Sequence, residues 1–353
     1  MNAEVRPIKT AAETALAQSF AAVRRALPGA GAVGALREDA FRRFETEGLP
    51  HRRVEEWKYT DLRALMREAK PLAAVPDAAA KARAKDALAM LPAIEARRVV
   101  FVDGALVAEL SDLSGLEAGL TIRSMAQALA AGDRDLLAYL GRIVPTDDVA
   151  VALNTAFMGD GAVIHVAQGA ALVQPIHLVF VNAGGEPASV FARSLAVIGK
   201  GARAMLVESH LGAIASDTQV NTALELKVGD EAHVDHIKIT GDGAGALHVS
   251  TLMAAIGAHA RFNEFLFTTG GAVVRNQAFV RFDGEGTIAG IRGASLLKGR
   301  QHADTTLVAD HAAADCTSRE VFKSVLDQEG RSVFQGKIIV RRHAQKTDAK
   351  MAT

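Results

Sequence analysis

Cysteine is nearly absent from this sequence of 353 residues, in which Cys316 is the only one. A single thiol cannot close an internal disulfide, and a structural zinc ion or an iron–sulfur cluster needs about four ligands. We therefore expect a protein of the reducing cytoplasm. We also expect this chain to bind no cofactor by itself.

An excess of charge of either sign is absent too, because 40 basic side chains balance 40 acidic ones. Zero net charge excludes a polybasic nucleic-acid-binding protein. Charged residues make up 23% of the chain and hydrophobic residues 49%, which supplies a large buried core and excludes a disordered chain. The length suggests about two domains or one elongated domain.

No stretch of the sequence predicts a membrane span or a secretory signal. The range Gly161–Gly185 lacks Asp, Glu, Lys and Arg and is long enough to cross a bilayer. However, Pro175 breaks a helix, and His165 and His177 would lose their hydration there. Short strands and turns fit this range better. The N-terminus carries Glu4 and has no apolar signal core.

The first part of the sequence has helical periodicity. Apolar residues at helical spacing predict helices over 8–27 and 35–47, and a third helix-rich piece follows Pro50. Residues 77–91 are rich in Ala, Lys and Asp without a wide apolar stripe. We expect this segment to be a solvated helix or a mobile insertion rather than part of the core.

A short pattern recurs five times in the second part of the sequence. The copies are Ile198–Ala202, Val228–Ala232, Ile256–Ala260, Phe282–Gly286 and Val308–Ala312. Their second positions are spaced by 30, 28, 26 and 26 residues, their first position is always large and apolar, and their fifth is always Ala or Gly. Such a repeat predicts stacked copies of one structural unit.

Strand patterns flank the copies, as in Thr222–Val228, where Leu224, Leu226 and Val228 share one face. One strand, one tight turn and a second strand per repeat predict one coil of a parallel β-helix. The small fifth position would bend over the core, where a longer side chain has no room. We expect one axial column formed by Ala202, Ala232, Ala260, Gly286 and Ala312.

These patterns together predict a mainly β fold. A right-handed parallel β-helix core would span 149–340, preceded by a helical, α+β region over 1–148. That region contains a small β-hairpin, because apolar runs flank the turn signal Asp103-Gly104.

The third position of the repeat holds the most interesting polar residues. Glu231, His259, Glu285 and His311 would lie about 4.8 Å apart if the coils are in register. Alternating imidazole and carboxylate groups could hold a metal ion. A surface ladder of opposite partial charges needs no ligand, and we favour that interpretation.

Cys316, His233 and His236 are further candidate site residues. A cation such as His311 or Arg319 could lower the pKa of the Cys316 thiol and make it a sulfur acceptor. A free cysteine is more often a small buried hydrophobic residue, and we prefer that reading. His233 and His236 would lie on opposite faces of a strand and could not share a metal ion. We therefore assign no catalytic, cofactor-binding or metal-binding residue.

Two nucleotide-binding patterns are excluded by their context. Gly29–Gly34 matches G-x-G-x-x-G, but a helix precedes it where the dinucleotide fingerprint needs a strand. Gly336-Lys337 resembles a P-loop, but Arg331 replaces the first glycine and Ile338 replaces the Ser or Thr that binds magnesium. We expect a helix-capping linker in the first case and no ATP binding of that kind in the second.

Two segments resemble the SufB/SufD family of iron–sulfur cluster assembly proteins. Pro50–Leu62 contains Trp-Lys-Tyr-Thr-Asp-Leu, which is similar to a signature near the start of that family. Asp304–Lys350 contains Phe-Gln-Gly-Lys and Ala-Gln-Lys-Thr-Asp, which resemble its later core. The repeats lie between them, so the resemblance spans nearly the whole chain. A lone cysteine favours the SufD branch, because SufB carries the cysteines thought to receive sulfur.

The resemblance implies a β-helix scaffold that pairs with SufB and docks the ATPase SufC. In the family, the Ala-Gln-Lys-Thr-Asp segment is followed by a Cys-x-His-Gly motif and by helices that engage SufC. This sequence reaches only Thr353. The resemblance therefore implies that residues 341–353 begin a C-terminal helical segment of which this form lacks most. We expect this form to bind SufC poorly. Whether the chain forms a homodimer alone stays open.

The leading hypothesis is thus a non-enzymatic scaffold subunit of the SUF complex, with neither membrane nor nucleic acid as a partner. The alternative is a β-helix enzyme acting on carbohydrates, or an acyltransferase. The first would need aromatic platforms, and aromatic residues make up 5% of the chain, with Trp57 outside the repeats. The second would need a period near six. A third hypothesis is a metal store that uses the histidine ladder.

Overall fold

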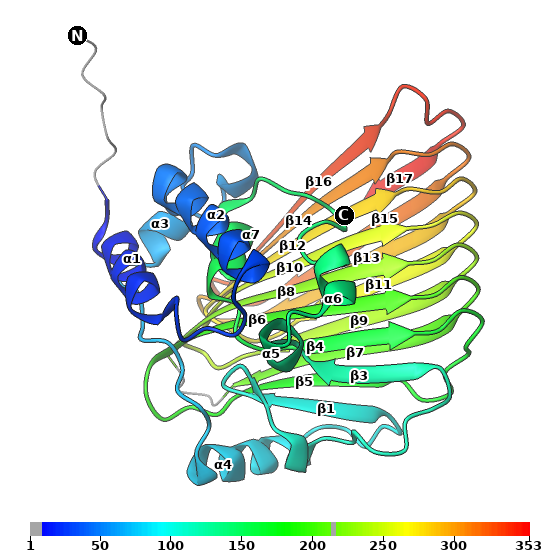
Figure 1. Ribbon diagram of the computed structural model, residues 1–353. Helices are drawn as coiled ribbons and strands as arrows, with labels where there is room; N and C mark the ends of the chain where they lie inside the picture. The colour runs from blue at the N-terminus through cyan, green and yellow to red at the C-terminus, as the bar shows by residue number, and fades with distance from the viewer. Residues whose placement is uncertain (1–8, 213–216) are drawn as a thin grey trace.

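Strands and tight turns alternate through most of the chain, and the strands form two stacked sheets (Figure 1). The computed structural model describes residues 9–212 and 217–353. Sheet A contains, in spatial order, β16 (Arg331–Val340), β14 (His302–His311), β12 (Val273–Phe282), β10 (Leu247–Ile256), β8 (Thr218–Val228), β6 (Ala188–Ile198), β4 (Ala162–Val166) and β3 (Leu120–Ser124).

Sheet B contains β17 (Asp348–Ala352), β15 (Thr317–Leu326), β13 (Ile288–Leu297), β11 (Arg261–Thr268), β9 (His233–Gly241), β7 (Arg203–Gly212), β5 (Ile176–Asn182), β1 (Arg97–Val102) and β2 (Ala105–Leu106). From β4 onward, even-numbered strands pair in parallel with even-numbered ones and odd with odd. Each coil therefore contributes one strand to each sheet. The predicted mainly β fold with a parallel β-helix is confirmed.

The core between the sheets is apolar near the turns that lead from sheet A to sheet B. Ile198, Val228, Ile256 and Phe282 end successive strands of sheet A and are at most 1% exposed. The strand register places them in one column. In the first four copies this column is the large apolar first position of the sequence repeat, and it points inward as predicted. The fifth copy is wrong, because His311 rather than Val308 is in register with Phe282, and Val308 lies on the outer face.

The small column is confirmed in its first three members. Ala202, Ala232 and Ala260 each precede the first residue of a sheet B strand, and those first residues are in register. All three side chains are at most 1% exposed. The turn leaves no space there for a longer side chain, as the restricted fifth position of the repeat indicated.

The last two members of the predicted column are wrong. Ile288 pairs with Arg261 and Thr317 pairs with Ile288, so Thr287 and Cys316 follow Ala260 in the column. Gly286 and Ala312 lie elsewhere in their turns. For Gly286 the cause is turn length, because residues 283–287 connect the strands, one residue more than in the preceding coils. For Ala312 the repeat was aligned three residues early, because His311 rather than Val308 corresponds to Phe282. The turn pattern in the sequence does not reveal that insertion.

Replacing Ala260 by leucine should lower the free energy of unfolding by about 1–3 kcal/mol, because overpacking forces strained rotamers or backbone shifts. The Ala260 side chain is fully buried among the coils. Urea unfolding followed by circular dichroism measures the change. Ala171→Leu, at an exposed position, is the control and should change stability by less than about 0.5 kcal/mol. Equal stability of Ala260→Leu and the parent chain would contradict the column.

Helices cover the outer face of sheet A (Figure 1). The helical elements are α1 (Ala11–Val23), α2 (Ala32–Glu47), η1 (Glu55–Trp57), α3 (Leu62–Leu65), α4 (Ala78–Ala89), η2 (Ala108–Leu110), α5 (Met125–Ala130), α6 (Arg134–Tyr139) and α7 (Val149–Phe157). Thr10 and Glu13 form a capping box at the start of α1. Phe20, Phe41 and Phe157 pack together and join these helices to the sheet.

Helix α4 differs from the expectation of a solvated or mobile segment. Ala80, Ala84 and Leu88 are spaced by one helical turn and are buried against Val100 and Val179 of sheet B. A stripe of small residues can pack closely on a sheet although its hydrophobic periodicity is weak. The other face of α4 is exposed, as its Lys and Asp residues predicted.

The predicted hairpin is confirmed, and it joins the β-helix. Asp103 and Gly104 have φ angles of 48° and 84°, as in the tight turns that suit hairpins. Strand β1 pairs antiparallel with β2 and parallel with β5, so the hairpin extends sheet B. At the other end, Asp348–Ala352 form β17 where we expected the start of a helix. The division at residue 149 stays a prediction.

The Trp-Lys-Tyr-Thr segment is fastened to the outer face of sheet A. The Trp57 indole donates to Asp148 Oδ2 (2.9 Å) and lies under the Arg275 guanidinium, 4.7 Å from the ring centre. Thr60 donates to Asp304 (2.6 Å), which also pairs with Arg275 (2.5 Å). Asp148 is half-buried and the other four residues are buried. The segment therefore acts as a clamp between the N-terminal helices and the sheet.

The range Gly161–Gly185 forms β4, a turn and β5, as expected for strands and turns. Among residues 9–212 and 217–353, no helix is both long enough and apolar enough to cross a bilayer.

Candidate functional site

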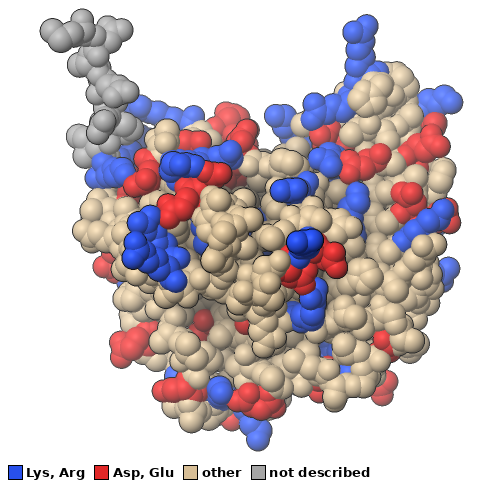
Figure 2. Space-filling view, viewed as in Figure 1, with Lys and Arg blue, Asp and Glu red and all other residues tan. Residues whose placement is uncertain are grey.

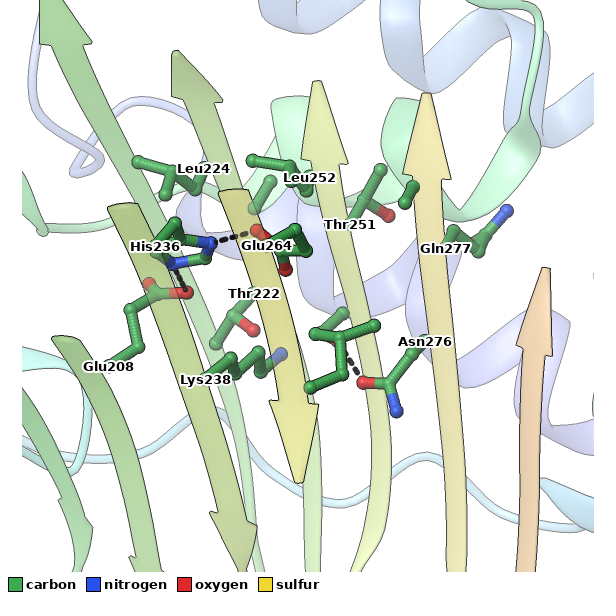
Figure 3. Close-up of a pocket in the computed structure, with 14 residues that line it drawn as sticks. Glu208, Thr222, Leu224, His236, Lys238, Thr251, Leu252, Glu264, Asn276 and Gln277 are labelled. Carbon is green, nitrogen blue, oxygen red and sulfur yellow. Dashed lines mark hydrogen bonds and ion pairs between the residues drawn. The ribbon is translucent and has the colours of Figure 1, made fainter. Parts of the chain in front are cut away.

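A row of charged side chains lies inside the β-helix, in the half of its interior opposite the apolar turns (Figure 3). Inward positions of sheet B carry Glu208 on β7, His236 on β9 and Glu264 on β11. The His236 ring lies between the two carboxylates: Nδ1 is 2.6 Å from Glu264 Oε2 and Nε2 is 3.3 Å from Glu208 Oε2. His236 and Glu264 are each 1% exposed.

The two carboxylates keep His236 protonated. Burial alone would lower the pKa of the imidazole, but Glu264 and Glu208 outweigh burial and raise it to about 10. Burial opposes ionisation of Glu208 too, yet its hydrogen bond to His236 leaves the Glu208 pKa lowered. Near neutral pH this arrangement is therefore an imidazolium between two carboxylates, in which Nδ1 donates to Glu264 and Nε2 forms an ion pair with Glu208.

Lys238 adds a second buried cation two residues along the same strand. Its side chain is buried, and burial lowers its pKa despite attraction to Glu208, Asp242 and Glu264. Strands of sheet A face it with hydroxyl and amide groups: Ser250 donates to Asn276 (2.8 Å) in the opposite wall. These walls enclose a cavity of about 10 Å³, which is the space of about one water molecule.

The polar interior continues toward the turns that lead from sheet B to sheet A. His248 Nδ1 is 2.6 Å from Asp242 Oδ2, and His248 Nε2 is 3.1 Å from Thr222 Oγ1. Asn182 donates to the other oxygen of Asp242 (3.1 Å). The interior thus contains ionisable side chains that are hydrogen-bonded to one another and buried away from solvent. In the described part of the chain, no three His, Cys, Asp or Glu residues are grouped so as to hold a metal ion.

The predicted ladder of Glu231, His259, Glu285 and His311 does not form. Glu231 and His259 are equivalent turn positions with φ angles of 60° and 54°, but Gly286 rather than Glu285 follows them, because of the longer turn. His311 ends β14 in register with Phe282 and stacks on its ring, with 4.1 Å between ring centres. Burial lowers the pKa of His311. The metal store built on this ladder is therefore wrong.

Cys316 is a small buried residue, as we expected. Its side chain is fully buried in the small column, and Sγ is 3.3 Å from the Gly284 carbonyl oxygen. Burial raises the pKa of the thiol. His311 lies inward on the preceding strand but contacts Ser318 rather than the sulfur. Burial outweighs the hydrogen bonds from Thr287 and Gly286 that would favour a thiolate.

The Cys316 thiol should react with Ellman's reagent at least about 100-fold more slowly in the folded protein than in 8 M urea, because only the exposed thiolate attacks. The absorbance of released thionitrobenzoate measures the rate. Cys316→Ser should release none and serves as the blank. A folded-state rate equal to that of free cysteine would contradict the buried position.

The histidine pair and the two glycine motifs lie where the sequence predicted, and they form neither a metal site nor a nucleotide-binding loop among the described residues. His233 faces outward and His236 inward, so they do not share a site. Gly29–Gly34 spans the start of α2: Gly31 is the N-terminal cap of that helix, and residues 32–34 form its first turn. Gly336 and Lys337 lie within β16. None of these positions resembles a nucleotide-binding loop.

The hydrophobic pattern of the sequence does not predict the charged interior. In β9 the buried residues are Val234, His236, Lys238 and Thr240, and the isoleucines between them face outward. A hydrophobic alternation assigns those isoleucines to the core instead. The detectable signal was the spacing of two residues between polar groups on β7 and on β9, Glu208 with His210 and His236 with Lys238.

Comparison with known families gives two matches that together cover almost the whole chain. The family described as "SUF system FeS cluster assembly, SufBD core domain" matches residues 180–353. The family described as "SufBD protein N-terminal region" matches residues 12–178. The first range contains most of the β-helix, and the second contains the helices, the Trp57 clamp and the hairpin.

Curated proteins of the same family are similar over most of the chain. An iron–sulfur cluster assembly SufBD family protein of Synechocystis sp. is 31% identical over 319 residues, which is 86% of this chain and 68% of that protein. The iron–sulfur cluster assembly protein SufD of Escherichia coli is 29% identical over 313 residues, 86% of this chain and 69% of that protein. A SufBD family protein of Mycobacterium tuberculosis is 29% identical over 58% of this chain and 52% of its own length. The chain therefore belongs to the SufBD family of iron–sulfur cluster assembly proteins.

Proposed function

We propose that this protein is a non-enzymatic scaffold subunit of a cytoplasmic SUF complex, in which it pairs with SufB and with the ATPase SufC. The observation that carries the proposal is the match to both SufBD regions, over 12–178 and 180–353. In this role the iron–sulfur cluster is cargo. The rigid β-helix presents a surface to SufB and relays the nucleotide-driven movement of SufC.

The last coil of the β-helix supports the pairing with SufB. Strands β16 and β17 each have a hydrogen-bonded neighbour on one side only within the described residues. Inward side chains of this coil, such as Phe334, Ile338 and Met351, are partly buried and pack against the core. Another β-helix can pack against these apolar side chains. We assign this end to SufB.

Size-exclusion chromatography with light scattering tests the proposal with purified SufB and SufC. We expect the chain and SufB to elute together, and Ile338→Lys to weaken that pairing at least about tenfold. Val173→Lys, at an apolar position that is 87% exposed away from this coil, is the matched control. Circular dichroism confirms that both variants are folded. Separate elution of the parent chain and SufB at micromolar concentrations would refute the pairing.

A further inference from the structure

A groove lies on the outer face of sheet A, beside the helices that cover that face in Figure 1. Its floor is formed by Phe279, Val308 and Ile339 of β12, β14 and β16. Its walls are formed by residues 47–51, by 54, 56 and 57, and by 145–149. The volume is about 510 Å³, within the usual range of ligand and peptide sites. We name it the sheet A groove.

The sheet A groove combines an apolar floor with an acidic rim. Four carboxylates line it, those of Glu47, Glu56, Asp147 and Asp148, against the single lysine Lys337. The imidazole of His51 completes the charged or ionisable lining. Elsewhere on the face of the molecule that Figure 2 shows, both signs of charge are interspersed. The rim therefore has a local excess of negative charge on a protein whose net charge is zero.

Two of these carboxylates are already engaged, and two are not. Asp147 pairs with Arg43 (3.0 Å), and Asp148 accepts from Trp57 and Gln277 (2.9 Å each). Glu47 and Glu56 are exposed, and their carboxylates have no ion pair or hydrogen bond within the described parts of the chain. They are free to accept from a cationic group.

A second observation also indicates a missing hydrogen-bond donor. Gln277 is 3% exposed and lines the groove, and its amide nitrogen is fixed by Asp148. Its Oε1 atom is buried and has no hydrogen-bond partner. Leaving a buried acceptor unpaired is unfavourable. A ligand N–H group that displaces the edge of the groove and reaches this oxygen would satisfy it.

We propose that the sheet A groove binds an amphipathic, basic segment of a partner protein. Apolar side chains of the segment would pack on Phe279 and Val308, while a Lys or Arg would lie between Glu47 and Glu56. Its N–H groups could reach Gln277 Oε1. This is the helix-in-groove mode of recognition, with affinity from the apolar floor and selectivity from the acidic rim. The groove lies on the outer face of the sheet, apart from the strand edge assigned to SufB.

Trp57 provides a specific readout, because it is the only tryptophan of the chain and forms part of the groove wall. The probe is a 14-residue peptide of leucine and lysine at helical spacing, and a matched peptide carries glutamate in place of lysine. We expect the Leu/Lys peptide to change Trp57 emission saturably. The Leu/Glu peptide should bind at least tenfold more weakly. Added salt should weaken the Leu/Lys complex.

Charge reversal places the binding in the groove. Glu47→Lys/Glu56→Lys should weaken binding of the Leu/Lys peptide at least tenfold. The matched control is Glu95→Lys/Glu186→Lys, which reverses two exposed carboxylates outside the groove and should leave the affinity within twofold. Both substituted pairs are exposed, so folding is preserved. Equal binding of the two peptides, equal loss in both double variants, or no saturable change up to 1 mM peptide would overturn the proposal.

Discussion

Replacing Glu225 by alanine should lower the free energy of unfolding by about 3–5 kcal/mol, because it leaves a buried charge without its partner. Glu225 and Arg193 are 0% and 1% exposed by side chain, and Arg193 Nη2 is 2.6 Å from Glu225 Oε1. Both oxygens of Glu225 also accept from the Gly141 backbone N–H, at 2.9 Å each. The substitution therefore leaves the Arg193 guanidinium without its carboxylate and the Gly141 backbone N–H without its acceptor.

The pair joins sheet A to the helices above it. Arg193 Nη1 donates to Asn154 and Thr155 of α7, at 3.3 and 3.2 Å. Urea unfolding followed by Trp57 fluorescence and far-ultraviolet circular dichroism measures the loss. Glu285→Ala, at an exposed turn position, is the control and should change stability by less than about 0.5 kcal/mol.

The double substitution Arg193→Met/Glu225→Leu should cost less than Glu225→Ala alone. Replacing both members of a buried ion pair by apolar groups is often close to neutral, whereas removing one member is not. A cost of Glu225→Ala below about 1 kcal/mol would contradict this account of the interface.

Replacing His236 by glutamine should also destabilise the protein by about 3–5 kcal/mol near neutral pH. The substitution removes the cation between Glu208 and Glu264 and leaves two carboxylates facing each other in the interior. Urea unfolding at pH 7 measures the change. His233→Gln, on the outward face of the same strand, is the matched control and should cost less than about 1 kcal/mol.

The pH dependence of stability gives an independent check on His236. Its pKa is about 10 in the folded protein and about 6.5 in the unfolded chain. Its contribution is therefore complete below about pH 6.5 and is lost as the pH rises through about 10. The parent chain should lose stability over that window, and His236→Gln should lose less. The lowered pKa of Glu208 acts in the opposite direction, since its contribution is lost as the solution is acidified below about pH 4.5.

Urea midpoints measured from pH 6 to pH 10.5 reveal the difference between the two proteins. His233→Gln should retain the slope of the parent chain. Identical slopes for the parent chain and His236→Gln would mean that His236 is not the titrating group in this window.

The β-helix could be predicted from sequence because its turns impose local rules. The inward column of Ile198, Val228 and Ile256 and the small column of Ala202 and Ala260 are set by contacts between successive coils, and each coil repeats them. The failure at Gly286 had an equally local cause. A turn with one extra residue preserves an Asp-Gly pattern while shifting the residue that faces the core.

The charged interior could not be predicted by the same reasoning. His236 and Lys238 occupy positions whose neighbours Ile237 and Ile239 are more hydrophobic, so local patterning reverses the two faces of β9. The reason these polar groups are tolerated inside lies on other coils, in Glu208 and Glu264. Each is 28 residues from His236 in sequence, and only the strand register brings them together.

The Trp57 clamp has a consequence for how the protein is made on the ribosome. The backbone oxygen of Glu56 accepts from Arg275 and from Gln335, which follow it by 219 and 279 residues. At about 5–20 residues per second, Gln335 is added roughly 15–55 seconds after Glu56. During synthesis the early coils can stack on the β1 hairpin as they emerge. Until Arg275 and Gln335 are made, the clamp segment lacks these partners and is accessible to chaperones. The segment that is translated among the first is thus among the last to reach its native contacts.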